Sequence, residues 1–541
     1  MKPTILALSI GLCAAATPAQ MSGLYVIDPA TPGAFASFTE AVNAMFVGGV
    51  NGPVELLVAP GSYNESILFP PISGASASNT ITFKPLVGPG TVEITGSAGD
   101  IFAMLAVPFQ RNRSVIWDGI SFMGAPGHAI SATTFVEDLE IKNCYFASGH
   151  QSSAAGEYRH CVLISQNSGN EIGWRVHHNT ITLSTYTNRT SYGIYLSNGG
   201  GWEIHNNTID LNGGDHGLYM INNNGSLDQV YNNLFIGSLH QTSSSSANAQ
   251  CAIRADISNY NNQISHNTFA LSLTSSQCCI ATSATTSYQN YIYGNVFFIT
   301  GGTAIVTAES SGAPRPFESD GNVFFCPGGN IGRVNASSSG TAYATLAAWQ
   351  AAVGKDAASI EADPQLNDPF GTPPDLRPTP TSPVVGVAVN TPAWVVDDFA
   401  GRLRDAAPDA GAYESTSFAL YGQACAGTGG VAPMLGSSGV AQLGSASFAI
   451  ELTQAPANAI TVIFGGLQPL DLDLGGCQLL ASPDATALLI SDPGGAATFA
   501  FPLPFDPSLS GADLFFQWAV SDGGSVSPIG LTFTEGGALQ L

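Results

Sequence analysis

The sequence predicts an all-β protein: a right-handed parallel β-helix with three strands per coil, followed by a small β-sandwich-like domain. Three observations predict this fold. A short motif containing an asparagine recurs about every thirty residues, apolar residues hold fixed places within the motif, and the composition combines 61 Gly with only 15 Lys+Arg in 541 residues. Such a composition suits a β-rich extracellular protein and suits long helices poorly.

Residues 1–19 are predicted to be a secretory signal peptide. Lys2 precedes an apolar run at 5–12, and the small residues 17–19 form a cleavage site before Gln20. The run is too short to cross a bilayer, and no later stretch reaches the length of a membrane helix. We therefore expect a protein that is secreted or held at the cell surface. In the mature chain we expect the β-helix at residues 20–415 and the C-terminal domain at residues 418–541.

The repeat is clearest in segments 175–181, 203–209, 229–235, 263–269 and 291–297, which share one template. Looser copies are assigned to segments that end at Asn143 and Asn322. Successive asparagines are 36, 28, 26, 34, 28 and 27 residues apart, by subtraction along the series Asn143, Asn179, Asn207, Asn233, Asn267, Asn295 and Asn322. This period with variable insertions is typical of a solenoid, whereas a propeller blade needs about forty residues or more.

Each repeat is interpreted as two short strands that flank a tight turn. Both strands point an apolar side chain inward, where it stacks on its counterpart in the next coil. The asparagine lies at the turn, where its amide can bond the next asparagine and where it tolerates a left-handed backbone. A third strand precedes the pair, at 193–196, 217–220, 251–254 and 303–306. The inward columns are Val176, Ile204, Val230, Ile264 and Ile292, and then Ile181, Ile209, Phe235, Phe269 and Phe297.

With these features the chain resembles the secreted bacterial β-helix proteins of the pectin-lyase-like superfamily, over roughly residues 22–415. The resemblance implies a capping helix at 37–43, a first coil at 54–65 and a closing run that contains 363–366, 382–384, 398–402 and 408–414. The resemblance is specific for the fold, but it is a poor guide to the function. The Asn-Thr-Asp, paired Asp and Arg-Ile-Lys elements of the polygalacturonases and the Asp-Pro-His-Asp of the alginate epimerases have no counterpart in this sequence.

The C-terminal residues alternate apolar and polar side chains at 446–452, 460–464 and 514–520, which predicts the strands of a sandwich. This part looks like the C-terminal domains appended to varied secreted bacterial proteins, which implies surface retention or sorting. Its two cysteines, Cys425 and Cys477, are predicted to form a disulfide. Two interpretations remain open for the cysteines of the repeat region, burial in stacked coils or bridging between coils: Cys144, Cys161, Cys251, Cys278, Cys279 and Cys326.

The formal charge of −24 restricts the partners. Nucleic acid and anionic lipid both need a cationic face on the protein, so both are excluded as expected partners. An extracellular polysaccharide or cell-surface glycan is the expected partner of a monomeric chain.

The candidate binding surface is a polar and aromatic stripe beside the first inward column. Its residues alternate with the buried ones and therefore face outward, where sugars could bind by stacking and hydrogen bonding. An ordinary solvated sheet face is the alternative. One column of the stripe holds Arg175, Glu203, Gln229, Gln263 and Tyr291, and the other holds His177, His205, Tyr231, Ser265 and Tyr293. The expected substrate-binding residues are Arg175, His177, Glu203, His205 and Tyr231, with Tyr195, Tyr219 and Arg254 exposed on the neighbouring face.

The sequence does not decide whether the protein is an enzyme. We assign no catalytic residue and no metal ligand from it. A lyase needs a base and a cation, for which Arg175, Arg254, His177 and His205 are candidates. A glycoside hydrolase needs two carboxylates, and the nearby acids are Glu203, Asp210, Asp215 and Asp256. Besides glycan binding with or without weak activity, two hypotheses remain. One is a structural or adhesive surface protein. The other is a scaffold stabilised by Ca²⁺ near the junction acids Asp397, Asp398, Asp405 and Asp409.

Overall fold

The computed structural model describes most of the chain from residue 19 onward. It describes 19–541 without 97–98, 106–109, 126, 134–135, 148–158, 166–172, 185–189, 223–225, 241–249, 257–260, 283–288, 308, 311–312, 315–316, 335–339, 380–381, 402–403, 405–406, 415–417, 440, 442–444, 505–508 and 510–511. The predicted signal peptide therefore lies outside the described residues, apart from its last residue. Among the described helices, none has the length and apolar character needed to cross a membrane.

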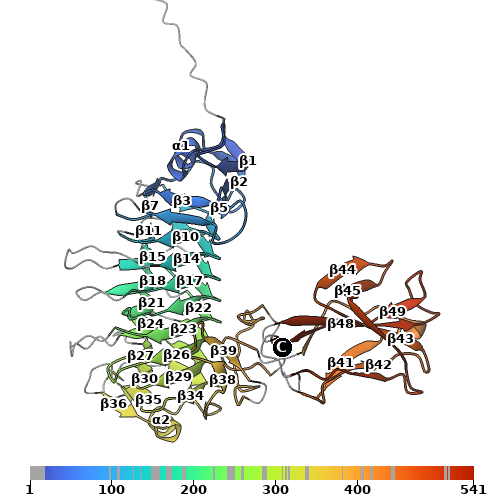
Figure 1. Ribbon diagram of the computed structural model, residues 1–541. Coiled ribbons are helices and arrows are strands. Elements are labelled where there is room, and N and C mark those ends of the chain that lie inside the picture. Colours follow the sequence, from blue (N-terminus) through green and yellow to red (C-terminus); the bar gives the residue numbers. More distant parts are fainter. Residues whose placement is uncertain are drawn as a thin grey trace, which may run out of the picture.

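The predicted parallel β-helix is confirmed: three sheets of eleven strands each run along one stack of coils (Figure 1). Sheet A consists of β1 (Met21–Ile27), β2 (Val50–Val58), β5 (Ile81–Pro85), β9 (Val115–Asp118), β13 (Glu140–Lys142), β16 (Arg175–His177), β19 (Glu203–His205), β22 (Asp228–Tyr231), β25 (Asn262–Ser265), β28 (Asn290–Tyr293) and β33 (Phe317–Asp320).

Sheets B and C complete each coil. Sheet B consists of β3 (Gly61–Asn64), β6 (Val92–Thr95), β10 (Ser121–Met123), β14 (Tyr145–Ala147), β17 (Thr180–Thr182), β20 (Thr208–Asp210), β23 (Leu234–Ser238), β26 (Thr268–Ser272), β29 (Val296–Thr300), β34 (Val323–Phe325) and β37 (Ile360–Glu361). Sheet C consists of β4 (Ile67–Phe69), β7 (Phe102–Met104), β11 (Ile130–Ala132), β15 (Arg159–Ser165), β18 (Ser191–Ser197), β21 (His216–Ile221), β24 (Cys251–Asp256), β27 (Cys278–Thr282), β30 (Thr303–Thr307), β35 (Asn330–Val334) and β36 (Thr341–Tyr343).

The inward columns lie where the repeat predicts them. All ten side chains of the two columns are fully buried in one continuous core. Neighbouring coils pair them in register, as with Val176 and Ile204 in sheet A and Phe235 and Phe269 in sheet B, whose rings stack 4.9 Å apart. Because each apolar side chain covers the one in the next coil, the repeat itself supplies the core.

Two helices lie at the two ends of the coil stack (Figure 1). Helix α1 (Phe38–Gly48) begins after Ser37, whose side chain accepts a hydrogen bond from the Glu40 amide, and is longer than the predicted 37–43. At the other end, α2 (Leu346–Val353), which the sequence did not suggest, presses Trp349 onto Gly332, where an added Cβ would lie 2.1 Å from the indole ring. Each helix covers apolar ends of coils that would otherwise face water.

The turn between sheets A and B carries the predicted asparagine ladder. In this ladder Nδ2 of each asparagine donates to Oδ1 of the next at 2.9–3.1 Å, through the series Asn179, Asn207, Asn233, Asn267, Asn295 and Asn322. Two details of the prediction are wrong. The left-handed residue is the one before each ladder asparagine, such as His178 or Asn206. Asn143 belongs to that column, because it has a φ of 54° and Cys144 takes the ladder position by donating its amide to Asn179 Oδ1.

After the last coil the chain forms the hairpin of β38 (Leu366–Asp368) and β39 (Asp375–Pro378) and then passes along the outside of the A–B turn. We call residues 382–414 the closing segment. Its backbone accepts hydrogen bonds from the turn residues Asn206 and Asn232, and Thr391 bonds His266. At Gly321 an added Cβ would lie 2.6 Å from the Val389 amide, so the segment sits directly on the turn.

The C-terminal residues form antiparallel sheets around a second core, as the alternation predicts. One sheet has β40 (Phe418–Tyr421), β43 (Ile460–Gly466), β46 (Ala485–Ile490), β48 (Asp513–Ser521), β49 (Leu531–Phe533) and β50 (Gly536–Gln540). A second has β41 (Met434–Ser438), β42 (Ala449–Thr453) and β47 (Ala497–Ala500), and a hairpin joins β44 (Pro469–Asp473) to β45 (Gln478–Ala481). The first two share a core that includes Ile450 and Trp518.

The predicted Cys425–Cys477 disulfide is present. In the repeat region both open interpretations hold, each for part of the set. Cys251 and Cys278, register partners on β24 and β27, are bridged, whereas Cys144, Cys161 and Cys279 are buried and Cys326 is half-buried. Two disulfides indicate a protein that matures outside the reducing cytoplasm.

Candidate functional site

The stripe on the outer face of sheet A has the predicted register. Arg175, Glu203, Gln229, Gln263 and Tyr291 are successive strand partners, and so are His177, His205, Tyr231, Ser265 and Tyr293. Arg175 is exposed and bonded to Glu140 one coil earlier at 2.5 Å, Ser265 is buried, and the other eight side chains are half-buried. Because neighbouring strands lie about 4.8 Å apart, five coils give a surface about 19 Å long.

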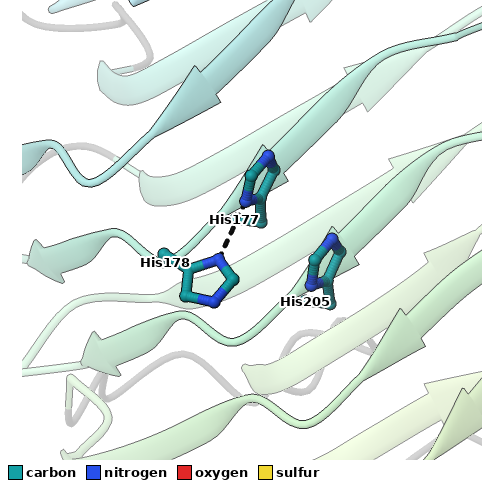
Figure 2. Close-up of side chains that lie close together, drawn as sticks. All are labelled: His177, His178 and His205. Atoms are coloured by element: carbon teal, nitrogen blue, oxygen red, sulfur yellow. Dashed lines mark hydrogen bonds between the residues drawn. The ribbon is translucent and has the colours of Figure 1, made fainter. Parts of the chain in front are cut away.

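At one end of this stripe three imidazoles meet, and we call His177, His178 and His205 the histidine cluster (Figure 2). One ring nitrogen from each lies within 4.8 Å of the other two. His177 and His205 face each other across β16 and β19 with their rings parallel at 4.7 Å, while His178 comes from the left-handed turn position. The repeat thus brings together residues 28 positions apart, by subtraction.

Polar neighbours hold the rings of the cluster in place. His177 Nδ1 lies 2.8 Å from His178 Nδ1, and His177 Nε2 lies 3.4 Å from a carboxylate oxygen of Glu140. His205 Nδ1 lies 2.9 Å from Asn206 Oδ1, whose own amide nitrogen donates to the carbonyls of Asp398 and Phe399 in the closing segment. The closing segment therefore orients His205 through Asn206.

Burial and these contacts set the protonation states. Burial lowers the pKa of His205 to about 4, and burial together with the neighbouring His177 lowers the pKa of His178. The hydrogen bond from His177, with help from Lys142 and Arg175 and against the effect of burial, holds the pKa of Glu140 well below its usual range. At neutral pH the site therefore combines neutral imidazoles at His178 and His205 with an ionised carboxylate.

The rings of the stripe stack on one another rather than lying flat on the sheet. Tyr231 continues the column of His177 and His205, with its ring 4.7 Å from that of His205 and nearly parallel. The ring faces between His177 and His205 and between His205 and Tyr231 therefore cover one another. Of the stacking and hydrogen bonding that we expected, the stacked rings leave fewer faces open to a ligand in this column.

The remaining expected residues form a second cluster on the outer face of sheet C. Tyr195 and Tyr219 are half-buried with parallel rings at 5.2 Å, and the Arg254 guanidinium lies 5.6 Å from the Tyr219 ring centre. The prediction that Arg254 is exposed is wrong, because its side chain is buried against Asp256, to which its Nε and a terminal nitrogen donate at 3.0 and 2.7 Å. Tyr219 donates to the same carboxylate oxygen at 3.0 Å.

The sheet C cluster joins a cation, an acid and aromatic hydroxyls, and His216 lies close by, with its ring 5.5 Å from that of Tyr219. Burial, assisted by Arg254, lowers the pKa of His216 to about 3, and burial together with Asp256 raises the pKa of Tyr219 far above its usual value. A general base works best with a pKa near the working pH. Neither His216 nor Tyr219 is therefore suited to abstract a proton at neutral pH.

The acids considered for hydrolysis are spread over the three sheets. Glu203 lies on sheet A, Asp210 on sheet B, and Asp215 and Asp256 at opposite ends of strands of sheet C.

The junction acids have structural partners: Asp398 accepts the amides of Ala400 and Glu414, and Asp409 accepts that of Gly386. Asp405 lies outside the described residues. A search of the described ranges for three or more His, Cys, Asp or Glu residues whose possible metal-binding atoms lie close together finds one group. That group is the histidine cluster, with these atoms within 4.8 Å of one another.

Reasoning from sequence missed His178 and Glu140 as members of the site. His178 lies in the turn before Asn179, and Glu140 lies one coil before the stripe as the strand partner of Arg175. The adjacent pair His177-His178 followed by His205 one repeat later was the signal that could have identified the cluster, once the strands are stacked in register.

Comparison with known proteins agrees with the fold. Residues 111–253, or 143 of 541 residues, match the model of a family described as periplasmic copper-binding protein (NosD). The match includes the histidine cluster and the first coils of the stripe. No curated protein matches the chain.

Several solved structures are similar at low identity. The PL6 family alginate lyase AlyGC shares 12% identity over 75% of this chain, with a TM-score of 0.31, and the match spans 60% of that enzyme's length. A mannuronic acid specific polysaccharide lyase of family 6 from human gut microbiota shares 11% over 58% of this chain and 81% of its own, with a TM-score of 0.28. Tailspike protein 2 of the Escherichia coli O157:H7 bacteriophage CAB120 shares 10% over 96% of this chain and 68% of its own, with a TM-score of 0.26. At these TM-scores the likenesses carry no argument about activity.

Proposed function

We propose that this protein is a secreted or cell-surface β-helix that binds an extracellular polysaccharide through the stripe on sheet A. The observation that carries the proposal is the register of polar and aromatic side chains over five coils, of which all but Ser265 are at least partly exposed. A surface about 19 Å long with a repeat of about 4.8 Å suits an extended polymer better than a compact ligand.

The chemistry of the stripe favours a neutral glycan. Gln229, Gln263 and Tyr291 offer uncharged donors and acceptors, and the single exposed cation of the stripe, Arg175, is already paired with Glu140. The chain as a whole carries a net charge of −24, which repels polyanions. Hydrogen bonds from ring edges and amides then supply the contacts.

Catalysis is a weaker proposal, because it needs groups poised to move protons. The pKa values of His216 and Tyr219 lie far from neutrality in the directions that oppose base catalysis. An assay for unsaturated products from acidic polysaccharides tests the lyase alternative, and their release would assign an activity beyond binding.

A glycan array followed by calorimetry tests the binding proposal. We expect neutral polysaccharides to bind, and the triple variant Gln229→Ala, Gln263→Ala, Tyr291→Ala to bind at least ten times more weakly, because three adjacent coils lose their hydrogen-bonding ends. These side chains point away from the core, so the fold should persist.

The matched control is Thr180→Ala with Thr208→Ala, two outward positions in register on sheet B. This pair should leave binding unchanged. Silence of the wild-type protein across neutral and acidic polysaccharides, or equal binding by the triple variant, would refute the role of the stripe.

A further inference from the structure

The larger sheet of the C-terminal residues has an open edge. β46 is the last strand of the order β40-β50-β48-β43-β46, and among the described strands it pairs with β43 alone. The side chains of Leu488 and Ile490 on β46 are 70% and 64% exposed, and Ile460, the strand partner of Ile490, is 54% exposed. We call Ile460, Val462, Leu488 and Ile490 the β46 edge patch. It combines an apolar surface with the backbone of an edge strand.

The backbone groups of β46 point to where another strand would bind. The amide of Ser491 donates to the carbonyl of Ala459 at 3.0 Å, which places a hydrogen-bonded pair of the antiparallel ladder at these residues. Bonded pairs alternate with non-bonded pairs along such a ladder. The N–H and C=O groups of Thr486, Leu488 and Ile490 therefore point to the open edge. The side chains of these three residues are exposed as well, so an incoming strand would meet both.

The features that normally prevent edge pairing are missing from β46. Natural sheets block an edge strand with Lys, Pro, a bulge or a covering loop. The sequence of β46 is Ala-Thr-Ala-Leu-Leu-Ile, without charge or proline, and its pairing with β43 runs over six residue pairs without a shift in register. The strand therefore suits strand addition, in which backbone hydrogen bonds supply affinity and alternate side chains supply specificity.

Charge decides which partner fits this edge. Residues 418–541 contain seven Asp and two Glu but no Lys, Arg or His. Two of these acids, Asp484 and Asp492, lie at the two ends of β46 and are exposed. Hydrogen bonds from the Leu467 amide and the Ser482 hydroxyl lower the pKa of Asp484, so its carboxylate is ionised at neutral pH. An acidic surface without cations attracts a basic partner.

We propose that β46 binds an extended, basic segment of another protein, which adds to the sheet as its next strand. The segment would direct alternate apolar side chains onto the β46 edge patch. It would carry Lys or Arg about eight residues apart, opposite Asp484 and Asp492, whose numbers differ by eight. This interaction is separate from glycan binding by the stripe on sheet A, and neither proposal depends on the other.

The same charges and side chains disfavour other occupants. In a two-fold symmetric pair of β46 strands, Asp484 of one copy would approach Asp492 of the other, and facing like charges destabilise a strand pair. Anionic lipid is repelled by the acidic surface. A sugar would meet aliphatic side chains instead of the aromatic rings and polar groups that bind it.

The experiment measures the fluorescence polarisation of a labelled peptide titrated with the full-length protein. The Lys peptide is Lys-Thr-Val-Thr-Val-Thr-Val-Thr-Lys with blocked termini, and the Glu peptide has Glu in place of both Lys. We expect saturable binding of one Lys peptide per chain and at least tenfold weaker binding of the Glu peptide. Affinity for the Lys peptide should fall at least threefold between 50 and 300 mM NaCl, because salt screens the charges.

Substitutions on β46 test the position of the peptide. Leu488→Lys with Ile490→Lys should weaken binding of the Lys peptide at least tenfold, because the patch loses its apolar side chains and gains like charge. The Tm should stay close to wild type, since both side chains are exposed. Leu472→Lys with Val526→Lys is the matched control, because it adds the same charge at two exposed apolar positions outside the patch. This control should change the affinity less than threefold.

Substitution of the two flanking acids tests the charges. Asp484→Asn with Asp492→Asn should lower the affinity for the Lys peptide at least threefold and reduce its dependence on NaCl. The new amide oxygens can still accept the backbone N–H groups that the carboxylates bind, so the turns at both ends of β46 should persist.

Several results would overturn the proposal. Absence of saturable binding, equal binding of the Lys and Glu peptides, or unchanged binding by Leu488→Lys with Ile490→Lys would show that the edge takes no basic strand. Wild-type dimers in sedimentation velocity that this variant abolishes would assign the edge to a second copy. Binding to phosphatidylcholine vesicles that the variant loses would assign it to a lipid surface. Glycan binding is measured on the same variants, so failure of the edge and failure of the stripe are read separately.

Discussion

Histidine side chains in this protein take on different chemistry according to where the coil places them. His216 lies on sheet C with its ring stacked on Tyr192 at 5.3 Å, and its Nδ1 accepts the Cys251 amide at 3.3 Å. His266 is wholly buried under the closing segment, and burial, assisted by Arg404, lowers its pKa well below the usual value. Such residues stabilise the fold as neutral rings and resist protonation.

This burial predicts a loss of stability in acid. The pKa of His216 is about 3 in the folded chain and about 6.5 when unfolded, so the unfolded state binds the extra proton first. The contribution of His216 to the free energy of unfolding is fully present above about pH 6.5. It falls as the pH drops toward 3, by up to about 1.4 kcal/mol per pH unit.

We expect His216→Asn to flatten this part of the profile of unfolding free energy against pH, measured by urea unfolding between pH 7 and 4. The variant cannot take up a proton there, while its amide oxygen can still accept the Cys251 amide. An unchanged slope would contradict the assignment.

The asparagine ladder shows how much one residue type can specify. Asn233 donates to the carbonyl of Ile204 and to Oδ1 of Asn267, and its own Oδ1 accepts the amide of Asn207, so each asparagine ties three coils together. The repeat predicted the ladder because the asparagine recurs at the same place in each coil and the coils stack in register. It misplaced Asn143 by one residue, since Cys144 fills the ladder position with its backbone amide and has no side-chain amide to mark it in the sequence.

At the scale of elements, the closing segment joins distant parts of the chain through one buried ion pair. Arg404 lies 2.9 Å from Glu414 with both side chains almost inaccessible to water. It also donates to Asn232 Oδ1 at 2.8 Å and to the carbonyls of Asp397 and Gly411. The arginine therefore fastens the segment to the turn that precedes sheet B.

Breaking this pair should be costly, because it leaves a charge buried without its partner. We expect Arg404→Met to lower the free energy of unfolding by about 3–5 kcal/mol, measured by urea unfolding. Adding Glu414→Gln should recover part of the loss, since the second change removes the unpaired charge. Hydrogen exchange should also increase at turn residues such as Asn206.

A surface pair provides the comparison for this effect. Arg377 and Asp375 are joined at 2.7 Å but both are partly exposed. Arg377→Met should therefore cost less than about 1 kcal/mol. Equal losses for Arg377→Met and Arg404→Met would show that the closing segment does not depend on the buried pair.

At the scale of the whole molecule, two hydrophobic cores share no residue among those described. One fills the coils, and the other lies between the C-terminal sheets around Trp518. Each core is covered by its own strands, and each part of the chain has its own disulfide outside that core, Cys251–Cys278 in the first part and Cys425–Cys477 in the second. We propose from this that residues 20–415 and 418–541 unfold as separate units.

Removing the second disulfide tests that division. The bond closes a loop of 52 residues, which the chain-entropy estimate values at about 4 kcal/mol. Cys425→Ser with Cys477→Ser should lower one calorimetric transition of the full-length protein and leave the other in place. One shared transition that shifts as a whole would contradict the division.

The sequence by itself determined the β-helix, its inward columns, the asparagine ladder and the outward stripe, because all of these follow from the side-chain alternation of a strand and the stacking of one coil on the next. Tertiary structure alone decided what lies against those surfaces. It buried Arg254 against Asp256, laid the closing segment on the A–B turn and set His178 beside His177 and His205. Such contacts depend on the height of each coil in the stack and on the path of a segment nearly two hundred residues away, which no local periodicity records.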